Sequence, residues 1–158
     1  MTIQVGDKLP AGSLKVMGAE GPEEKTISEL FDGKKVVMLA VPGAFTPGCS
    51  MTHLPGFVVN ADKIKAKGVD SIICLAVNDV FVMDAWGKAQ NAEAIIMAAD
   101  GSGDYTRLLD LELDVTAFGM GTRSRRYAMV VDNGEVTYLG IDAKAIEQSA
   151  AEAVMEAL

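Results

Sequence analysis

The chain has 158 residues, of which 49% are hydrophobic and 23% charged, a composition typical of one globular domain with an ordinary apolar core. Its net charge of −8 disfavours nucleic acid as a partner, because the phosphates would be repelled. No apolar run approaches the ~20 residues that span a bilayer, and the first residues resemble neither a secretory signal nor a transit peptide. We therefore expect a single domain over residues 1–158, a cytoplasmic location, and no nucleic-acid or membrane partner.

Hydrophobic patterning predicts strands that alternate with helices along the chain. The first half of the chain predicts a strand at 14–17, a polar loop at 18–25, a capped helix at 26–31, a buried strand at 35–41 and a helix from 47 to 67. The middle predicts strands at 69–77 and 95–99 around a helix at 80–90, and a short helix near 105–109. The end predicts a hairpin of strands 126–131 and 136–140, and a terminal helix over 141–158. The hairpin signal is Asp132-Asn133-Gly134, and Pro55 predicts a kink or a loosened turn in the long helix. This order predicts an α/β fold in three layers, with a central mixed sheet and helices on both faces.

The clearest chemical signal lies where the buried strand meets the long helix. The strand stops at Pro42-Gly43, a turn signal. Thr46 suits the N-cap and Pro47 the first helical position, which puts Cys49 in the first turn. Free backbone amides and the positive end of the helix dipole favour a thiolate over a thiol there. We therefore interpret Cys49 as a reachable nucleophile rather than as a small buried apolar residue.

Residues 41–57 read V-P-G-A-F-T-P-G-C-S-M-T-H-L-P-G-F. This segment resembles the active site of the peroxiredoxins, specifically the type II (peroxiredoxin-5) subfamily, and contains the family pattern P-x-x-x-T-x-x-C at Pro42, Thr46 and Cys49. The resemblance continues through V-N-D-x-F-V-x-x-x-W-G at 77–87 and R-Y-A-M-V-V-D at 126–132. It implies a thioredoxin-like form of the three-layer fold. It also implies a thiol-dependent peroxidase that reduces hydrogen peroxide and alkyl hydroperoxides without a metal or other cofactor.

The resemblance implies a role for each matching residue of the segment. Cys49 would be the peroxidatic cysteine, whose thiolate attacks the peroxide O–O bond and becomes a sulfenic acid. Thr46 would orient the attack through its hydroxyl, and Pro42 would shield the thiolate from water. Gly48 would let the backbone approach closely, so that its amide and that of Cys49 bind the peroxide oxygens.

An arginine completes the set that the resemblance implies. Its permanent charge would stabilise the thiolate and the departing oxygen. Three arginines cluster at Arg123, Arg125 and Arg126, and the residues alone do not decide among them. The family's arginine directly precedes the aromatic of the R-[FY]-x-M-V-V segment, which favours Arg126, with Arg123 as the second choice.

Two other residues bear on the mechanism. His53 lies four residues after Cys49, and thiol hydrolases also use a Cys–His pair. Because no third orienting group or oxyanion hole is evident, we expect His53 to form local hydrogen bonds instead. Cys74 lies in an apolar strand and should be buried and inert. Residues 141–158 lack the resolving cysteine of some family members, which predicts a one-cysteine cycle recycled by an external thiol: glutathione, glutaredoxin or thioredoxin.

Other interpretations share the fold or the cysteine. A redox-sensing interaction module would form the same sulfenic acid at Cys49 and change partner binding rather than clear peroxide. A disulfide reductase would need C-x-x-C, whereas position 46 is threonine. The resemblance suggests a homodimer through loops near the active site. We expect four large apolar residues to lie in the core or at an interface, with core packing favoured for each: Phe45, Leu54, Trp86 and Phe118. The resemblance implies that the equivalents of Phe45, Trp86 and the Phe118 loop lie near the mouth of the pocket in family dimers.

Overall fold

The structure is a computed structural model and describes residues 1–158. Its main sheet contains the strands β1 Ser13–Gly18, β2 Gly21–Thr26, β3 Lys35–Val41, β4 Ser71–Ala76, β5 Ile96–Ala99, β8 Arg126–Asp132 and β9 Glu135–Asp142. They lie side by side in the order β2-β1-β5-β4-β3-β8-β9. The three central strands β5, β4 and β3 are parallel, and both flanks join them antiparallel, so the sheet is mixed as predicted.

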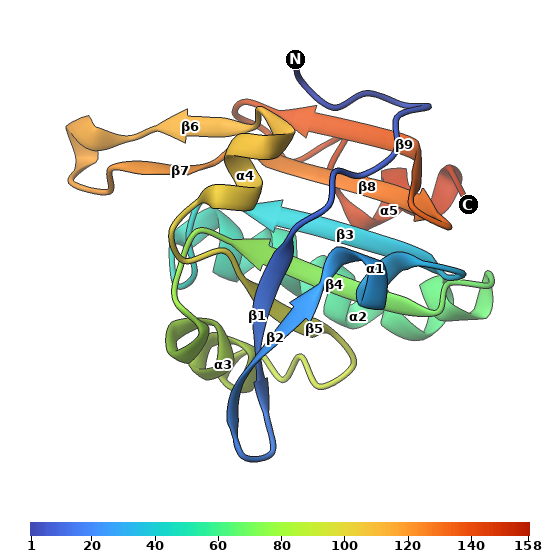
Figure 1. The fold of residues 1–158 in the computed structure, drawn as a ribbon, viewed down its shortest axis with the longest axis horizontal. Coiled ribbons are helices and arrows are strands. Elements are labelled where there is room, and N and C mark those ends of the chain that lie inside the picture. The colour runs from blue at the N-terminus through green and yellow to red at the C-terminus, as the bar shows by residue number, and fades with distance from the viewer.

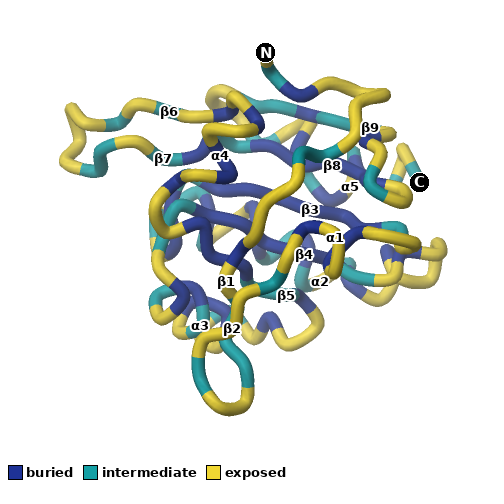
Figure 2. Tube along the Cα trace, viewed as in Figure 1, coloured by how far each residue is buried: buried dark blue, intermediate teal, exposed yellow.

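Helices cover both faces of this sheet (Figure 1). They are α1 Ile27–Phe31, α2 Leu54–Ala66, α3 Val80–Ala89, α4 Asp104–Leu109 and α5 Ala151–Glu156. Alternate residues of β3 divide between two cores, since successive side chains of a strand point to opposite faces. Val37 and Leu39 pack with α2, α3 and α5, whereas Val36 packs with α1 and α4. The three-layer prediction is confirmed, and the buried strands run through the middle of the molecule (Figure 2).

Local signals in the sequence account for several element boundaries. The Thr26 hydroxyl accepts from the backbone N–H of Glu29, and the Glu29 carboxylate accepts from that of Thr26, a reciprocal capping box that starts α1. Asn133 and Gly134 adopt positive φ angles of 48° and 81°, as a tight hairpin turn between β8 and β9 requires. The predicted strands at 35–41, 69–77 and 95–99 and the helix at 80–90 are confirmed with small shifts at their ends.

Three segments differ from the prediction. The polar loop expected at 18–25 contains β2, whose polar side chains stay exposed while its backbone pairs with β1 from Thr26 to Gly21. Strands β6 Glu112–Asp114 and β7 Thr122–Ser124, joined through a short 3-10 turn at Thr116–Phe118, were not predicted and extend from the body as an arm (Figure 1). The terminal helix covers only Ala151–Glu156, because β9 continues to Asp142 and the next eight residues form a loop.

No helix of this fold is both long and apolar enough to cross a bilayer.

Candidate active site

The junction between β3 and the following helix places Cys49. The helix begins at Pro47 and turns through Cys49–His53 as a widened π-helical turn before α2. Leu54 donates its backbone N–H to Cys49 O, five residues earlier, which widens the turn. Pro55 follows directly and has no N–H for a normal helical bond. The loosened turn predicted from Pro55 is therefore present, and it falls on the cysteine itself.

An arginine contacts the sulfur of Cys49. Arg126 Nη2 lies 3.3 Å from Cys49 Sγ and donates to it. Cys49 is buried within the core formed by α2, α3 and α5, which differs from the reachable sulfur expected from the sequence. Arg126 of β8 and Ile146 of the loop before α5 approach the first turn of the helix at Gly48, and such distant neighbours cannot be recognised from a local sequence pattern. The sulfur is thus enclosed, but beside a permanent positive charge rather than in hydrocarbon alone.

The structure distinguishes Arg126 from Arg123. Arg123 donates through Nε to Met120 O at 3.0 Å and through Nη1 to Pro42 O at 3.4 Å, and it does not bond to the sulfur. Arg123 therefore supports the loop that carries Pro42. Of the two arginines favoured from the sequence, the geometry brings Arg126 to Cys49.

His53 bonds to Arg126 and not to Cys49. Its Nδ1 lies 2.9 Å from Arg126 Nη1, and its Nε2 lies 2.8 Å from the backbone oxygen of Ser149. A carbonyl oxygen only accepts and a guanidinium only donates, so Nε2 carries the proton and Nδ1 is bare. Burial lowers the pKa of His53 to about 4, the positive charge of Arg126 adds to this shift, and the Ser149 carbonyl opposes it. The local hydrogen-bonding role expected for His53 agrees with this arrangement, and a Cys–His catalytic pair does not.

The remaining residues of the motif surround this centre. Thr46 occupies the N-cap position, because its carbonyl accepts from Ser50 N at 2.9 Å, but its hydroxyl donates to Gly43 O at 2.7 Å instead of capping the helix. A Cβ at Gly48 would lie 3.2 Å from Arg126 Nη2, so glycine there leaves room for the guanidinium. Thr46, Gly48 and Pro42 are partly exposed. The structure therefore brings four of the five predicted site residues next to one another, and the fifth, Arg126, reaches them from β8.

Comparisons with known proteins agree with this geometry. The redoxin family model matches residues 4–155. The chain is 47% identical over 160 residues to Peroxiredoxin-2D of Arabidopsis thaliana, covering 99% of this chain and 98% of the relative. The chain belongs to the peroxiredoxin family. As a peroxiredoxin it is a thiol-dependent peroxidase, and these relatives do not favour the redox-sensing alternative.

Solved structures place this peroxiredoxin in the thioredoxin-like fold that the sequence suggested. The structure of reduced Prx3 from Vibrio vulnificus in complex with hydrogen peroxide has 54% identity and a TM-score of 0.96, with 99% of both chains covered. Peroxiredoxin 5 from Alvinella pompejana has 35% identity and a TM-score of 0.87, with 98% of this chain and 97% of that one covered. The type II (peroxiredoxin-5) assignment is consistent with both.

The second cysteine of this peroxiredoxin lies in the same hydrophobic core as Cys49. Cys74 lies in β4, fully buried, and neither cysteine forms a disulfide. Burial raises the pKa of the Cys74 thiol far above its usual value, and the nearby Cys49 adds to this shift. The predicted burial of Cys74 is confirmed. A thiol that stays protonated and enclosed is a poor nucleophile, and the inertness of Cys74 stays a prediction.

The large apolar residues near the site divide into two groups. Trp86 and Leu54 are fully buried, as predicted, and Trp86 donates its indole N–H to Ser50 Oγ at 2.9 Å. Phe45 and Phe118 are 55% and 79% exposed, so the core packing predicted for them is wrong. Both lie in turns, and Phe45 has a positive φ of 65° that directs the chain around the start of the helix.

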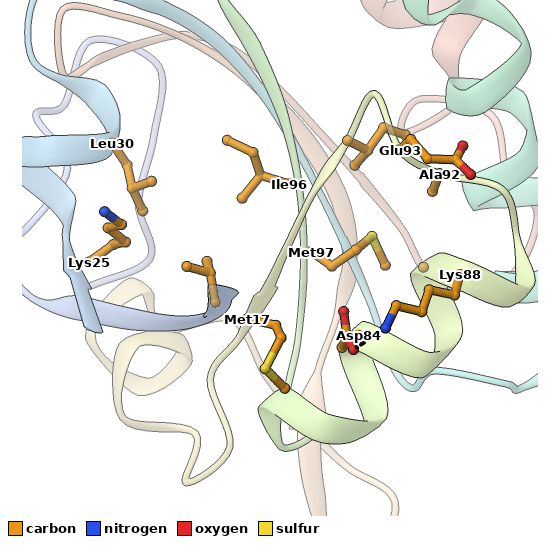
Figure 3. A pocket seen from close by; sticks show the side chains of 12 residues that line it. Met17, Lys25, Leu30, Asp84, Lys88, Ala92, Glu93, Ile96 and Met97 are labelled. Atoms are coloured by element: carbon orange, nitrogen blue, oxygen red, sulfur yellow. Dashed lines mark ion pairs between the residues drawn. The ribbon is translucent and has the colours of Figure 1, made fainter. Parts of the chain in front are cut away.

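Sequence reasoning missed Ser149 and the loop that presents it, because residues 143–150 carry no motif. It also gave no sign of a cavity of about 410 Å³ between β1, β5 and α3, lined by Met17, Met97, Ile96, Leu30 and charged residues at its rim (Figure 3). None of its lining residues belongs to the Cys49 site. This cavity is therefore separate from the Cys49 site.

Proposed function

We propose that Cys49 is the residue that reduces peroxide in this peroxidase. The single observation that supports this assignment most directly is the 3.3 Å contact between Arg126 Nη2 and Cys49 Sγ at the start of a helix. A guanidinium and the helix amides both stabilise a thiolate over a thiol. The arginine also faces the point at which negative charge develops on the departing oxygen.

The proposed reaction has two halves. In the first, the Cys49 thiolate attacks one peroxide oxygen, an S–O bond forms, and the O–O bond breaks. Sulfur loses two electrons and becomes sulfenic acid, while the other oxygen leaves as hydroxide or alkoxide and takes up a proton. In the second half, one external thiol displaces the sulfenic oxygen as water and forms a mixed disulfide. A second thiol then restores Cys49 and carries the disulfide away.

The other motif residues complete this proposal. The Thr46 hydroxyl, now bonded to Gly43 O, is free to turn an oxygen lone pair toward the proton of a bound hydroperoxide. Pro42 limits the access of water, since it has no backbone N–H to offer, and Gly48 leaves its amide open on the partly exposed side.

The identity of the external thiol is also part of the proposal. Peroxiredoxins use thiol reductants such as thioredoxin, and we propose glutathione with glutaredoxin, or thioredoxin, for this chain. The support is that Cys74, the only other cysteine, is fully buried and stays protonated, so no internal thiol is placed to resolve Cys49. The cytoplasmic location expected from the sequence stays a prediction.

We further propose a homodimer formed by the loops near Cys49. Ala44 N donates to Asn78 Oδ1 at 2.9 Å, and a Cβ at Gly43 would lie 3.3 Å from the Met120 side chain, so three loops converge there. These loops and the neighbouring helix starts expose large apolar side chains: Phe45, Met51, Phe81 and Phe118. Exposed apolar groups of this size are typical of an interaction surface.

The test is steady-state reduction of hydrogen peroxide with glutathione and glutaredoxin, and separately with thioredoxin and its reductase. The wild-type chain should turn over with at least one of these systems. The matched control is Cys49→Ser, which should be inactive with both. A Cys49→Ser protein with wild-type turnover would overturn the assignment of the nucleophile.

A further inference from the structure

A series of hydrogen bonds connects Cys49 to a carboxylate outside the site described above. From the sulfur it passes through the Arg126 guanidinium to the His53 ring, and from His53 Nε2 to the Ser149 carbonyl. Ser149 is itself held, because its backbone N–H and its hydroxyl donate to Asp142 Oδ2 at 2.8 Å and 2.7 Å. Every link in this series is at hydrogen-bonding distance.

Asp142 organises the loop that carries Ser149. Its carboxylate also accepts from the backbone amides of Glu147 at 3.0 Å and Gln148 at 3.2 Å, so four donors converge on one side chain. Although partial burial works in the opposite direction, the bonds from Ser149, Glu147 and Gln148 hold the pKa of this carboxyl below its usual value. Asp142 is in no ion pair. Its negative charge is matched by three loop amides and the Ser149 hydroxyl.

The position of the Ser149 carbonyl decides what His53 presents to Arg126. A neutral imidazole has one N–H and one bare nitrogen, and the two can exchange. The carbonyl opposite Nε2 requires the proton there, which leaves the Nδ1 lone pair for Arg126 Nη1. If the carbonyl moved away, the other tautomer would set an N–H against the guanidinium. Arg126 would then lose the acceptor that holds it beside the sulfur.

The strand register places Asp142 for this task. Arg126 and Asp142 lie opposite each other across the β8–β9 pair, so the loop leaves the sheet directly beside the arginine. The loop then returns over the active-site helix, since a Cβ at Gly48 would lie 4.0 Å from the Ile146 side chain. The loop is thus bonded to the site through Ser149 and packed against it through Ile146.

We propose that Asp142 is a positioning residue for the peroxidase, which fixes the Nε2–H tautomer of His53 through the Ser149 carbonyl and thereby holds Arg126 on Cys49. The proposal rests on the roles assigned above to Cys49 and Arg126. It extends the site to a carboxylate that never touches the peroxide. The Ala143–Ala150 loop therefore helps to position Arg126, in addition to joining β9 to α5.

The test compares Asp142→Asn with Asp132→Asn as the matched control. The two side chains lie on the same hairpin, but Asp132 is exposed and makes no side-chain hydrogen bond. Asn at 142 keeps the size of the side chain but turns an NH2 group toward the loop amides. A third variant, Ser149→Ala, removes one of the four bonds to Asp142 and keeps the carbonyl that faces His53. It is the milder change if Asp142→Asn folds poorly.

Two readouts separate positioning from simple stability. The first is the kcat/KM for hydrogen peroxide against the kcat/KM for the reducing thiol. The second is the 15N spectrum of the imidazole, which needs no assignment because His53 is the only histidine. Asp142→Asn should lower the peroxide kcat/KM by about 10- to 100-fold, as expected when a supporting bond to a reacting group is lost. It should leave the thiol value within about 2-fold and shift the spectrum toward a mixture of tautomers.

Ser149→Ala should move both readouts in the same direction by a smaller amount, and Asp132→Asn should move neither. An Asp142→Asn protein with the wild-type tautomer, or with wild-type peroxide kcat/KM, overturns the proposal. A loss of both kcat/KM values together, with the tautomer unchanged, also overturns it. Since the tautomer is read without turnover, this failure is distinct from that of the proposed nucleophile, which Cys49→Ser tests.

Discussion

Acidification should destabilise this protein through its one histidine. In the folded state burial lowers the pKa of His53 to about 4, whereas the unfolded chain takes up the proton at the ordinary value of 6.5. Between these two pH values the unfolded state binds more protons than the folded state. The free energy of unfolding therefore falls as the pH falls through this window, and the stability of the neutral ring is fully present only above it.

The magnitude follows from the width of the window. One proton changes the free energy of unfolding by about 1.4 kcal/mol per pH unit, so the interval from 6.5 to about 4 corresponds to about 3 kcal/mol. The ring is almost completely buried, so solvent screening does not reduce this value appreciably. For a domain of this size such a loss is a large part of the whole stability.

The assay is urea unfolding at pH 7.5, 6.0, 5.0 and 4.0 for the wild type and for His53→Gln. Glutamine keeps an N–H for the Ser149 carbonyl and an oxygen for Arg126 but takes up no proton. The wild type should lose about 3 kcal/mol more than His53→Gln across this range. Parallel curves for the two proteins, or an NMR titration of folded His53 with a midpoint near 6.5, would refute the reasoning.

Three further outcomes are expected. Tyr127→Phe should raise the free energy of unfolding by about 1 kcal/mol in urea unfolding, because the buried Tyr127 hydroxyl has no hydrogen-bond partner; a destabilised variant would show that the hydroxyl is satisfied. Cys74→Ser should keep peroxide turnover within about 2-fold of the wild type. The buried serine hydroxyl should lower the free energy of unfolding by about 1–3 kcal/mol. Arrest after one turnover would show that Cys74 resolves the sulfenic acid. Phe118→Asp should shift the sedimentation coefficient from dimer to monomer, because a charge would replace a 79% exposed phenyl ring on the proposed interface; an unchanged coefficient would place the interface elsewhere.

Features governed by neighbours in the sequence were predictable. The capping box of Thr26 and Glu29, the turn at Asn133 and Gly134 and the proline-led helix start before Cys49 each involve residues within one turn. Local geometry fixes these features whatever packs against them. For the same reason the motif around Cys49 led to the correct family.

Features that depend on distant partners were not predictable. The polar residues of β2 form a strand because their backbone pairs with β1. Without that partner in view, a polar segment of this kind predicts a loop. Residues 143–150 have helix-forming alanines, but four bonds to Asp142 hold them in a loop instead. The choice of Arg126 over Arg123 needed the direction of each side chain. The pairing of Arg126 with Asp142 further depended on a register shift between Val130 and Val131.

The burial of Cys49 has the same origin. The sequence shows a cysteine at a helix start, which predicts an ionisable sulfur, but it does not show that the core around α2, α3 and α5 encloses it. The exposure of Phe45 and Phe118 is the converse case. Apolar composition favours burial, whereas the turns that carry these two residues direct them outward. The two exposed phenyl rings lie on the surface where a second copy of the chain is proposed to pack.

The central claim is that Arg126 makes the Cys49 sulfur reactive toward peroxide. The direct measurement is the second-order rate constant for oxidation of reduced protein by hydrogen peroxide, followed by the fluorescence of Trp86, the only tryptophan, which bonds to the residue after Cys49. Arg126→Lys should lower this rate constant by about 10²- to 10³-fold, since lysine does not reproduce the paired contacts to Cys49 and His53. Arg123→Lys should cause a loss at least about 10-fold smaller. An Arg126→Lys protein that reacts at the wild-type rate would contradict the account.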